Sequence, residues 1–112
     1  MLNTENTLLI QDLVLESLED LKAQDITILN VSAACSFTDY MIIATGTSNR
    51  HVKSIAENIV IMAKDNNLDA LSHEGEALGE WALVDLGDAV VHIMKPDIRN
   101  YYEIEKLWSV DD

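Results

Sequence analysis

Apolar positions recur at helical spacing in two stretches of the chain, with polar side chains between them. In the first stretch they are Ile10, Leu13, Val14, Leu18 and Leu21. In the second they are Val52, Ile55, Ala56, Ile59 and Ala63. Thr47 or Ser48 suits the N-cap of the second stretch, and Asn66 and Asn67 suit its end, because asparagine tolerates a left-handed backbone. We therefore predict two amphipathic helices.

Shorter apolar runs predict five β-strands. The first begins at Ile26, where apolar residues switch to alternate positions, and the second is rich in β-branched residues and ends before Gly46. A tight turn at Leu86-Gly87-Asp88 joins the last two. The expected strands are a run starting at residue 26, then 39–45, 68–73, 81–85 and 89–94.

Pro96 opens a final predicted helix, whose apolar stripe is wide enough to stay partly exposed after packing. The stripe comprises Ile98, Tyr101, Tyr102, Ile104, Leu107 and Trp108. The element order is helix, two strands, helix, three strands, helix. This order predicts an α/β fold with a mixed five-stranded sheet and flanking helices. A chain of 112 residues is expected to form one domain, 1–112.

The chain is strongly acidic, with 20 Asp and Glu against 7 Lys and Arg and a formal net charge of -13. Its apolar content of 48% is that of a folded domain, not of a disordered acidic segment. A negative field of this size repels the phosphates of nucleic acids and attracts basic proteins. We therefore expect no direct binding to DNA, and a basic protein as partner.

Cellular location is predicted from the cysteine count and from the lack of apolar segments. Cys35 is the only cysteine, so no internal disulfide forms, and we expect a small, half-buried residue near a strand rather than a reactive thiol. No run reaches the length of a membrane span, and residues 1–6 lack the features of a signal peptide. These features predict a cytoplasmic protein that does not bind membranes.

The turn from Thr45 to His51 leads from a strand into a helix, where free backbone N–H groups can hold an anion. It lacks the second glycine and the lysine of a P-loop, and it is not a GxGxxG motif. The favoured interpretation is that Gly46 permits the turn and Ser48 caps the helix. Nucleotide binding remains the alternative.

Four carboxylates, Asp39, Glu74, Asp85 and Asp88, are the candidate magnesium ligands of a nucleotidyl-transfer enzyme. Two ligands on one strand face need alternate positions, whereas Asp85 and Asp88 are three apart and separated by a turn. Turn chemistry explains this pair better. We expect no metal and no cofactor.

The three histidines, His51, His73 and His92, lie far apart and lack the close pairing of a zinc-binding helix. His92 lies in an alternating apolar run, so we expect a hydrogen-bonded histidine of the sheet rather than a catalytic base. No serine or cysteine is marked as an activated nucleophile. The sequence therefore contains no catalytic constellation.

Residues 74–81 form an acidic loop with two glycines that ends on Trp81. This composition is typical of a recognition surface. Tryptophan is both a core filler and a frequent interface anchor, so packing of the indole beneath a helix is the alternative.

Read together, these segments resemble the iojap family, whose members are called ribosome silencing factors. The resemblance covers nearly the whole chain, and the order and spacing of its segments are highly specific. The segments are 22–26, 38–40, 43–52, 74–75, Trp81 with 84–88, 90–92 and 102–108.

The resemblance implies a fold similar to nucleotidyltransferases, but without their catalytic carboxylates. It implies a non-enzymatic protein that binds ribosomal protein fourteen of the large ribosomal subunit. Binding would block joining of the small and large subunits and repress translation under nutrient limitation. A homodimer through the exposed part of the final helix is a further hypothesis. The expected partner-binding residues are Trp81, which matches the family's tryptophan, with Glu80, Glu74, Asp85, Asp88 and Tyr101.

Overall fold

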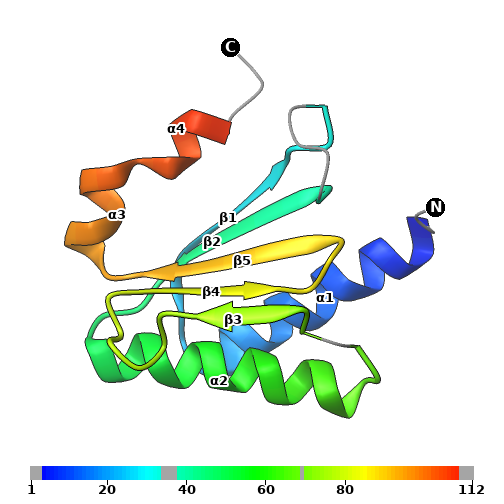
Figure 1. Cartoon of the computed structure of the whole chain (residues 1–112), viewed down its shortest axis with the longest axis horizontal. Coiled ribbons are helices and arrows are strands. Elements are labelled where there is room, and N and C mark those ends of the chain that lie inside the picture. Colours follow the sequence, from blue (N-terminus) through cyan, green and yellow to red (C-terminus); the bar gives the residue numbers. More distant parts are fainter. Residues whose placement is uncertain (1–3, 34–37, 69, 109–112) are drawn as a thin grey trace.

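The computed structural model describes residues 4–33, 38–68 and 70–108, without the side chains of 4–8 and 108 (Figure 1). Cys35 and the side chain of Trp108 therefore lie outside the described part of the chain. The elements, in chain order, are α1 (Thr4–Asp20), β1 (Gln24–Asn30), β2 (Tyr40–Thr45), α2 (Asn49–Asp65), β3 (Ser72–Glu74), β4 (Trp81–Asp85), β5 (Ala89–Met94), α3 (Pro96–Tyr102) and α4 (Ile104–Trp108).

The five strands form one sheet in the order β1-β2-β5-β4-β3. β2 and β5 are parallel, and the other three neighbouring pairs are antiparallel. A parallel pair needs a crossover connection, and the segment from α2 to β4 provides it. The predicted α/β fold, with a mixed five-stranded sheet and flanking helices, is confirmed.

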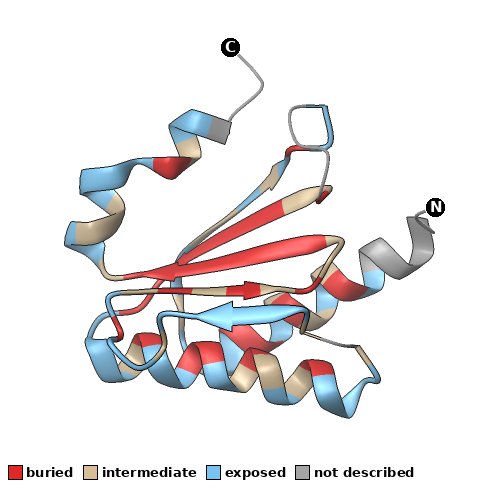
Figure 2. Cartoon of the chain, viewed as in Figure 1, coloured by how far each residue is buried: buried red, intermediate tan, exposed pale blue. Residues whose placement is uncertain are grey.

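One face of the sheet packs against α1 and α2 and contains the main hydrophobic core (Figure 2). Alternate residues of the strands point into this core, as the period of two requires. Both predicted amphipathic helices bury their apolar stripes here. The fully buried residues of this face include Val14 and Leu18 of α1, Ile55 and Ile59 of α2, Ile42 of β2, Ala82 and Val84 of β4, and Val91 and Ile93 of β5.

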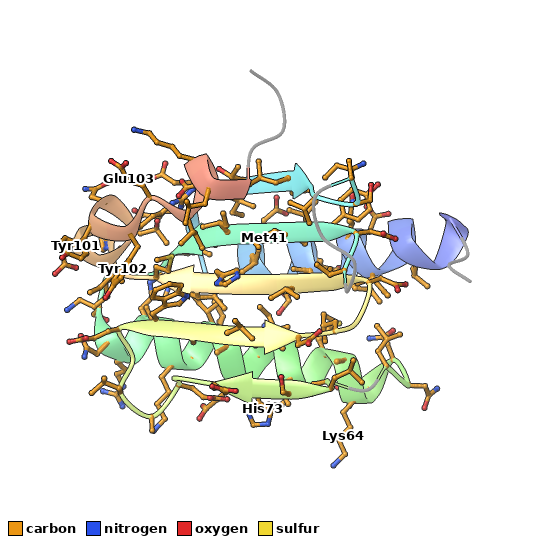
Figure 3. The ribbon with its side chains drawn as sticks, turned by 45° about the horizontal axis from the view of Figure 1, so that its top comes forward. Met41, Lys64, His73, Tyr101, Tyr102 and Glu103 are labelled. Atoms are coloured by element: carbon orange, nitrogen blue, oxygen red, sulfur yellow. The ribbon has the colours of Figure 1, made fainter. Side chains whose placement is uncertain are left out.

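The opposite face of the sheet, which we call the second face, packs against α3 and α4 at one end. Figure 3 looks onto it and labels Met41, the second residue of β2. A smaller cluster of buried residues forms between this face and α4, comprising Val31, Met41, Ile43, Met94 and Ile104. Trp81, Leu29 and Ile98 are partly buried against that cluster.

The predicted start of the first strand was wrong by two residues. β1 begins at Gln24, and its pairing with β2 shifts between Gln24 and Thr27, where Asp25 has a φ of 51°. Such a bulge interrupts the alternation on which the prediction relied. Ile28 shares the face of its partner Ile42 but remains 37% exposed, because β1 is an edge strand.

The third strand is shorter than predicted, because the residues after α2 form a cap on the helix. The N–H of Leu68 donates to the carbonyl of Ala63 (2.7 Å), and Asn67 has a φ of 60°. This arrangement is a Schellman cap, and it confirms the expected asparagine stop. Leu68 therefore belongs to the cap, and β3 contains only Ser72–Glu74.

The predicted final helix is two short helices. Glu103 adopts a left-handed conformation with a φ of 50°, and its N–H donates to the carbonyl of Arg99 (2.9 Å). A residue in this conformation ends a helix, so α4 starts in a new direction at Ile104. None of the helices in the described ranges has the length and apolar character needed to cross a membrane.

Candidate functional site: an aromatic corner of the sheet

Trp81 is the first residue of β4 and lies on the second face of the sheet. Along β4, Ala82 and Val84 are buried against the helices, while Trp81, Leu83 and Asp85 point the other way and are half-buried. The prediction left two surroundings open for Trp81, a recognition surface and packing beneath a helix, and the half-buried side chain combines features of both. Its indole packs on the edge of the smaller cluster and is not enclosed by it.

His92 lies diagonally across from Trp81, because Trp81 pairs with Met94 and His92 is two residues earlier on β5. The indole Nε1–H of Trp81 donates to His92 Nδ1 (2.9 Å), and the ring centroids are 5.9 Å apart. Burial lowers the pKa of His92 from 6.5 to about 4, because the charged form cannot be solvated there. The prediction of a hydrogen-bonded sheet histidine is confirmed.

Tyr102 and Tyr101, at the end of α3, extend the aromatic group outward. The rings of Tyr102 and Trp81 are 5.0 Å apart at 51°, and those of Tyr101 and Tyr102 are 4.9 Å apart at 84°. Tilted and edge-on pairs at these distances are favourable geometries for aromatic rings. Tyr101 is 80% exposed and Tyr102 49%, at the end of the sheet seen on the left of Figure 3. We call Trp81, His92, Tyr101 and Tyr102 the aromatic corner.

The backbone of the loop before β4 packs closely against the backbone of Trp81. Gly75 has a φ of 85°, and a Cβ on it would lie 2.1 Å from the carbonyl oxygen of Trp81. The N–H of Gly79 donates to the carbonyl of Gly75 (3.0 Å), and Asn49 Nδ2 donates to the carbonyl of Leu78 (2.9 Å). The two glycines of the predicted recognition loop thus serve close backbone approach, which fixes where β4 begins.

Arg99 fastens α3 to the edge of the sheet, and its side chain is only 10% exposed. Its NH1 group donates to the carbonyl of Asp25 (2.6 Å) and to Thr45 Oγ1 (2.8 Å), and its NH2 group donates to Thr27 Oγ1 (3.1 Å). Its Nε donates to Glu105 Oε2 of α4 (2.8 Å). No pattern in the sequence indicates this role of Arg99, because its partners Asp25, Thr27 and Thr45 lie far from it in the chain.

Two of the predicted partner-binding residues besides Trp81 lie at or beside the aromatic corner. Tyr101 belongs to the corner itself, and Glu80 is exposed directly before Trp81. Glu74 is exposed on the edge strand β3, opposite Leu83. Their contact with a partner remains a prediction.

Asp85 is the last residue of β4, four residues and about 13 Å from Trp81 along the strand, and Asp88 lies in the turn that follows. These two predicted partner-binding residues therefore do not surround Trp81, because the length of the strand separates its two ends. Asp85 Oδ1 accepts from the N–H of Gly87 (2.9 Å), and Gly87 has a φ of 87°. The predicted turn chemistry is confirmed for this pair.

The turn before α2 shows the favoured capping arrangement. Ser48 is the N-cap, and its Oγ accepts from the N–H of His51 (3.1 Å). The N–H of Thr47 donates to His51 Nδ1 (2.9 Å), and His51 Nε2 contacts the carbonyl of Leu21 (2.6 Å). The side chains of this turn thus satisfy two of its N–H groups.

The candidate magnesium ligands do not converge. Within residues 4–33, 38–68 and 70–108, no three His, Cys, Asp or Glu side chains lie close enough to hold a metal ion. Asp39 and Asp88 meet through their backbones, since the N–H of Asp39 donates to the carbonyl of Asp88 (3.2 Å). The described geometry therefore gives no support to the nucleotidyl-transfer alternative.

A family model described as "Ribosomal silencing factor during starvation" matches residues 4–112. The chain belongs to this family. It is 48% identical over 100 residues to the ribosomal silencing factor of Chromobacterium violaceum, covering 89% of this chain and 82% of that relative. A crystal structure of a protein from the same organism matches with a TM-score of 0.87 at 45% identity, covering 92% of this chain and 87% of that one.

Relatives also occur outside bacteria, and the predicted resemblance to the iojap family is confirmed. A mouse protein named "Mitochondrial assembly of ribosomal large subunit protein 1" is 34% identical over 102 residues, covering 88% of this chain and 45% of that protein. An Arabidopsis thaliana protein named "Iojap-related, mitochondrial" is 33% identical over 98 residues, covering 84% of this chain and 53% of that protein. The chain is thus a member of a family of ribosome-associated regulators of translation.

Proposed function

We propose that the protein binds ribosomal protein fourteen of the large ribosomal subunit through the aromatic corner. Its bulk then keeps the small subunit from joining, and translation is repressed under nutrient limitation. The observation that carries the proposal is the row of stacked rings from half-buried Trp81 to exposed Tyr101 on a chain of this family. We propose the cytoplasm as the place of action.

The aromatic corner has the properties of an interface anchor. Tryptophan and tyrosine are enriched among the residues that dominate binding energy, since they bury a large area with few rotatable bonds. The stacking of Tyr102 on Trp81 restricts both rings before a partner arrives. Ordering that is already present in the free protein does not have to be supplied on binding.

Charge supports a basic protein as the partner rather than ribosomal RNA. The chain has a formal net charge of -13, which repels phosphate and speeds encounter with positively charged protein surfaces. Glu80 adds an exposed carboxylate at the edge of the aromatic corner. The name of the mouse relative, which mentions the large ribosomal subunit, agrees with a partner on that subunit.

The proposed contacts differ in how far the geometry supports them. Trp81, Tyr101 and Glu80 would lie at the centre of the interface, and Glu74 at its edge beside β3. Asp85 and Asp88 would contact the partner only if it follows the whole length of β4, about 13 Å beyond Trp81.

The proposal is tested by the affinity of single-residue variants for purified ribosomal protein fourteen. We expect Trp81→Ala to weaken binding about 30-fold or more, in the range of interface hot spots, and Tyr101→Ala about fivefold, a smaller loss expected of a residue at the edge of the stack. Leu71→Ala is the matched control, because Leu71 is 67% exposed and its N–H donates to the carbonyl of Asp85, at the other end of β4 from Trp81. Equal affinities for all three variants and the parent protein would exclude the aromatic corner as the binding site.

We also propose that any likeness of the fold to nucleotidyltransferases is not accompanied by nucleotidyl transfer. The support is the separation of the carboxylates and the use of Asp85 Oδ1 by the turn. Calorimetric titration with nucleoside triphosphate and magnesium should give no binding heat. A saturable heat that Asp39→Asn abolishes would favour the enzyme instead.

Homodimerisation through the final helices would use exposed side chains of α3 and α4, such as Tyr101 and Leu107. Tyr101 also belongs to the aromatic corner. We propose that this surface serves the ribosomal partner, so light scattering should give the mass of one chain at micromolar concentration. A dimer that Tyr101→Ala dissociates would show that copies of the chain compete with the partner for this surface.

A further inference from the structure

The Trp81 side chain makes one hydrogen bond to another described residue. The indole has a single polar atom, Nε1, and its N–H donates to His92 Nδ1 at 2.9 Å. Because an indole N–H can only donate, Nδ1 must be unprotonated, and the neutral imidazole carries its proton on Nε2. The contact thus specifies both the charge state and the tautomer of His92.

His92 itself is firmly held. It lies in β5, where all six residues are buried, between neighbouring strands on both sides. Its cross-strand neighbours are Ile43 on β2 and Leu83 on β4, both apolar. His92 is 7% exposed, so a partner that docks on the corner does not need to touch it.

We propose that His92 is a positioning residue for the partner-binding site: it fixes the indole of Trp81 in the orientation that stacks on Tyr102. This inference rests on the proposed function of the aromatic corner, and it assigns a role to a residue that does not itself bind the partner. Without the acceptor, the half-buried indole N–H loses its hydrogen bond and turns toward water. The stack on Tyr102, with its ring separation of 5.0 Å, is then lost.

The loss of the hydrogen bond should lower the affinity for the partner, because an indole that is no longer held in one orientation has to be ordered when the partner docks. Ordering one large interface side chain lowers affinity by about two- to tenfold. The effect should therefore be smaller than that of deleting the ring in Trp81→Ala.

Three substitutions separate the acceptor from the volume of the side chain. His92→Asn places an amide oxygen near the position of Nδ1 and keeps the acceptor. His92→Gln places its amide near the position of Nε2, away from the indole, and His92→Leu has no acceptor. Thermal unfolding of each variant checks that the domain is folded under the conditions of the binding assay.

The indole resonance of Trp81 in a nitrogen–proton correlation spectrum reports the hydrogen bond without any partner present. Trp81→Phe assigns that resonance, and the indole of Trp108 gives the second signal. We expect the Trp81 indole proton to exchange slowly with water in the parent and in His92→Asn. In His92→Gln and His92→Leu we expect its shift to move and its exchange to quicken at least tenfold.

Affinity for purified ribosomal protein fourteen completes the test. His92→Gln and His92→Leu should bind two- to tenfold more weakly, and His92→Asn should remain within twofold of the parent. An unchanged indole signal in His92→Leu overturns the proposal. So does unchanged affinity in His92→Leu when Trp81→Ala has lost binding. If Trp81→Ala binds normally, the proposed function fails at this site, and the role of His92 in binding fails with it, whatever the indole signal shows.

Discussion

The neutral imidazole of His92 makes the stability of the fold depend on pH. Its pKa is about 4 in the folded protein, below the ordinary value of 6.5, because burial disfavours the charged form. Below pH 6.5 the unfolded chain therefore takes up a proton that the folded chain does not. The free energy of unfolding should fall as the pH drops from about 6.5 to about 4. Below about pH 4 this group causes no further change, because it is protonated in both states.

We predict that the contribution of His92 makes the free energy of unfolding about 2 kcal/mol lower at pH 5 than at pH 7.5. Urea unfolding at both pH values measures it. His92→Asn lacks the titrating group but retains all of the carboxylates, so its loss over the same interval should be smaller by that amount. Identical losses in the parent and in His92→Asn would contradict the neutral, buried state of His92.

Single residues were predictable where their chemistry is local. Ser48 as an N-cap and Asp85 with Gly87 as a turn follow from residue types a few positions apart. The pairing of Trp81 with His92 was not predictable, because it needs the register of β4 against β5. Tyr102 was assigned only to an apolar stripe, since nothing in the sequence brings it to Trp81.

At the scale of elements, α3 and α4 depend on Arg99 for their attachment to the sheet. α3 has seven residues and no buried residue of its own, so apolar packing alone holds it weakly. Arg99 joins it to Asp25, Thr27 and Thr45 on β1 and β2, and to Glu105 on α4. The position of the tyrosines at the end of α3 should follow from this attachment.

We predict that Arg99→Met lowers the free energy of unfolding by about 2 to 4 kcal/mol, since it removes several hydrogen bonds of a nearly buried charge. In the Arg99→Met variant, amide protons of α3 and α4 should exchange with deuterium faster than those of the other helices. Arg50→Met is the control, because it removes an arginine that is exposed at the start of α2. An equally small effect of both substitutions would show that the attachment does not depend on Arg99.

The kinds of element were predictable from periodicity, and their ends were not. The stripe of α2 and the alternation of β4 are set by burial on one face, which the sequence displays directly. The bulge at Asp25 and the break at Glu103 place non-glycine residues at positive φ. At Asp25 the carbonyl accepts from Arg99 of α3, 74 residues away in the chain. A sequence pattern contains no record of such contacts.

On the scale of the whole molecule, the acidic face of α1 and the aromatic corner lie on opposite sides of the sheet. The exposed acidic face of α1, with Asp12, Glu16 and Glu19, is on the helix-covered side of the sheet, whereas Trp81 is on the second face. The negative field of the whole chain would therefore speed its encounter with a basic partner, while Glu80 would act locally at the edge of the interface.

We predict that Glu80→Lys slows association with ribosomal protein fourteen two- to fivefold at low salt, and that 0.5 M salt removes most of the difference. Stopped-flow mixing measures the rate. Glu16→Lys makes the same change in charge on the far side of the molecule and should have less effect. Equal slowing by both variants would mean that net charge alone matters.

The central claim is that the protein occupies the free large subunit and keeps it from joining. Sedimentation of ribosomes through a density gradient tests it directly, with the protein added before the subunits are mixed. The account predicts that the protein travels with free large subunits, is absent from joined ribosomes, and lowers the joined fraction. Trp81→Ala should neither travel with free large subunits nor lower the joined fraction. Protein found equally on joined ribosomes, with no loss of joining, would contradict the account.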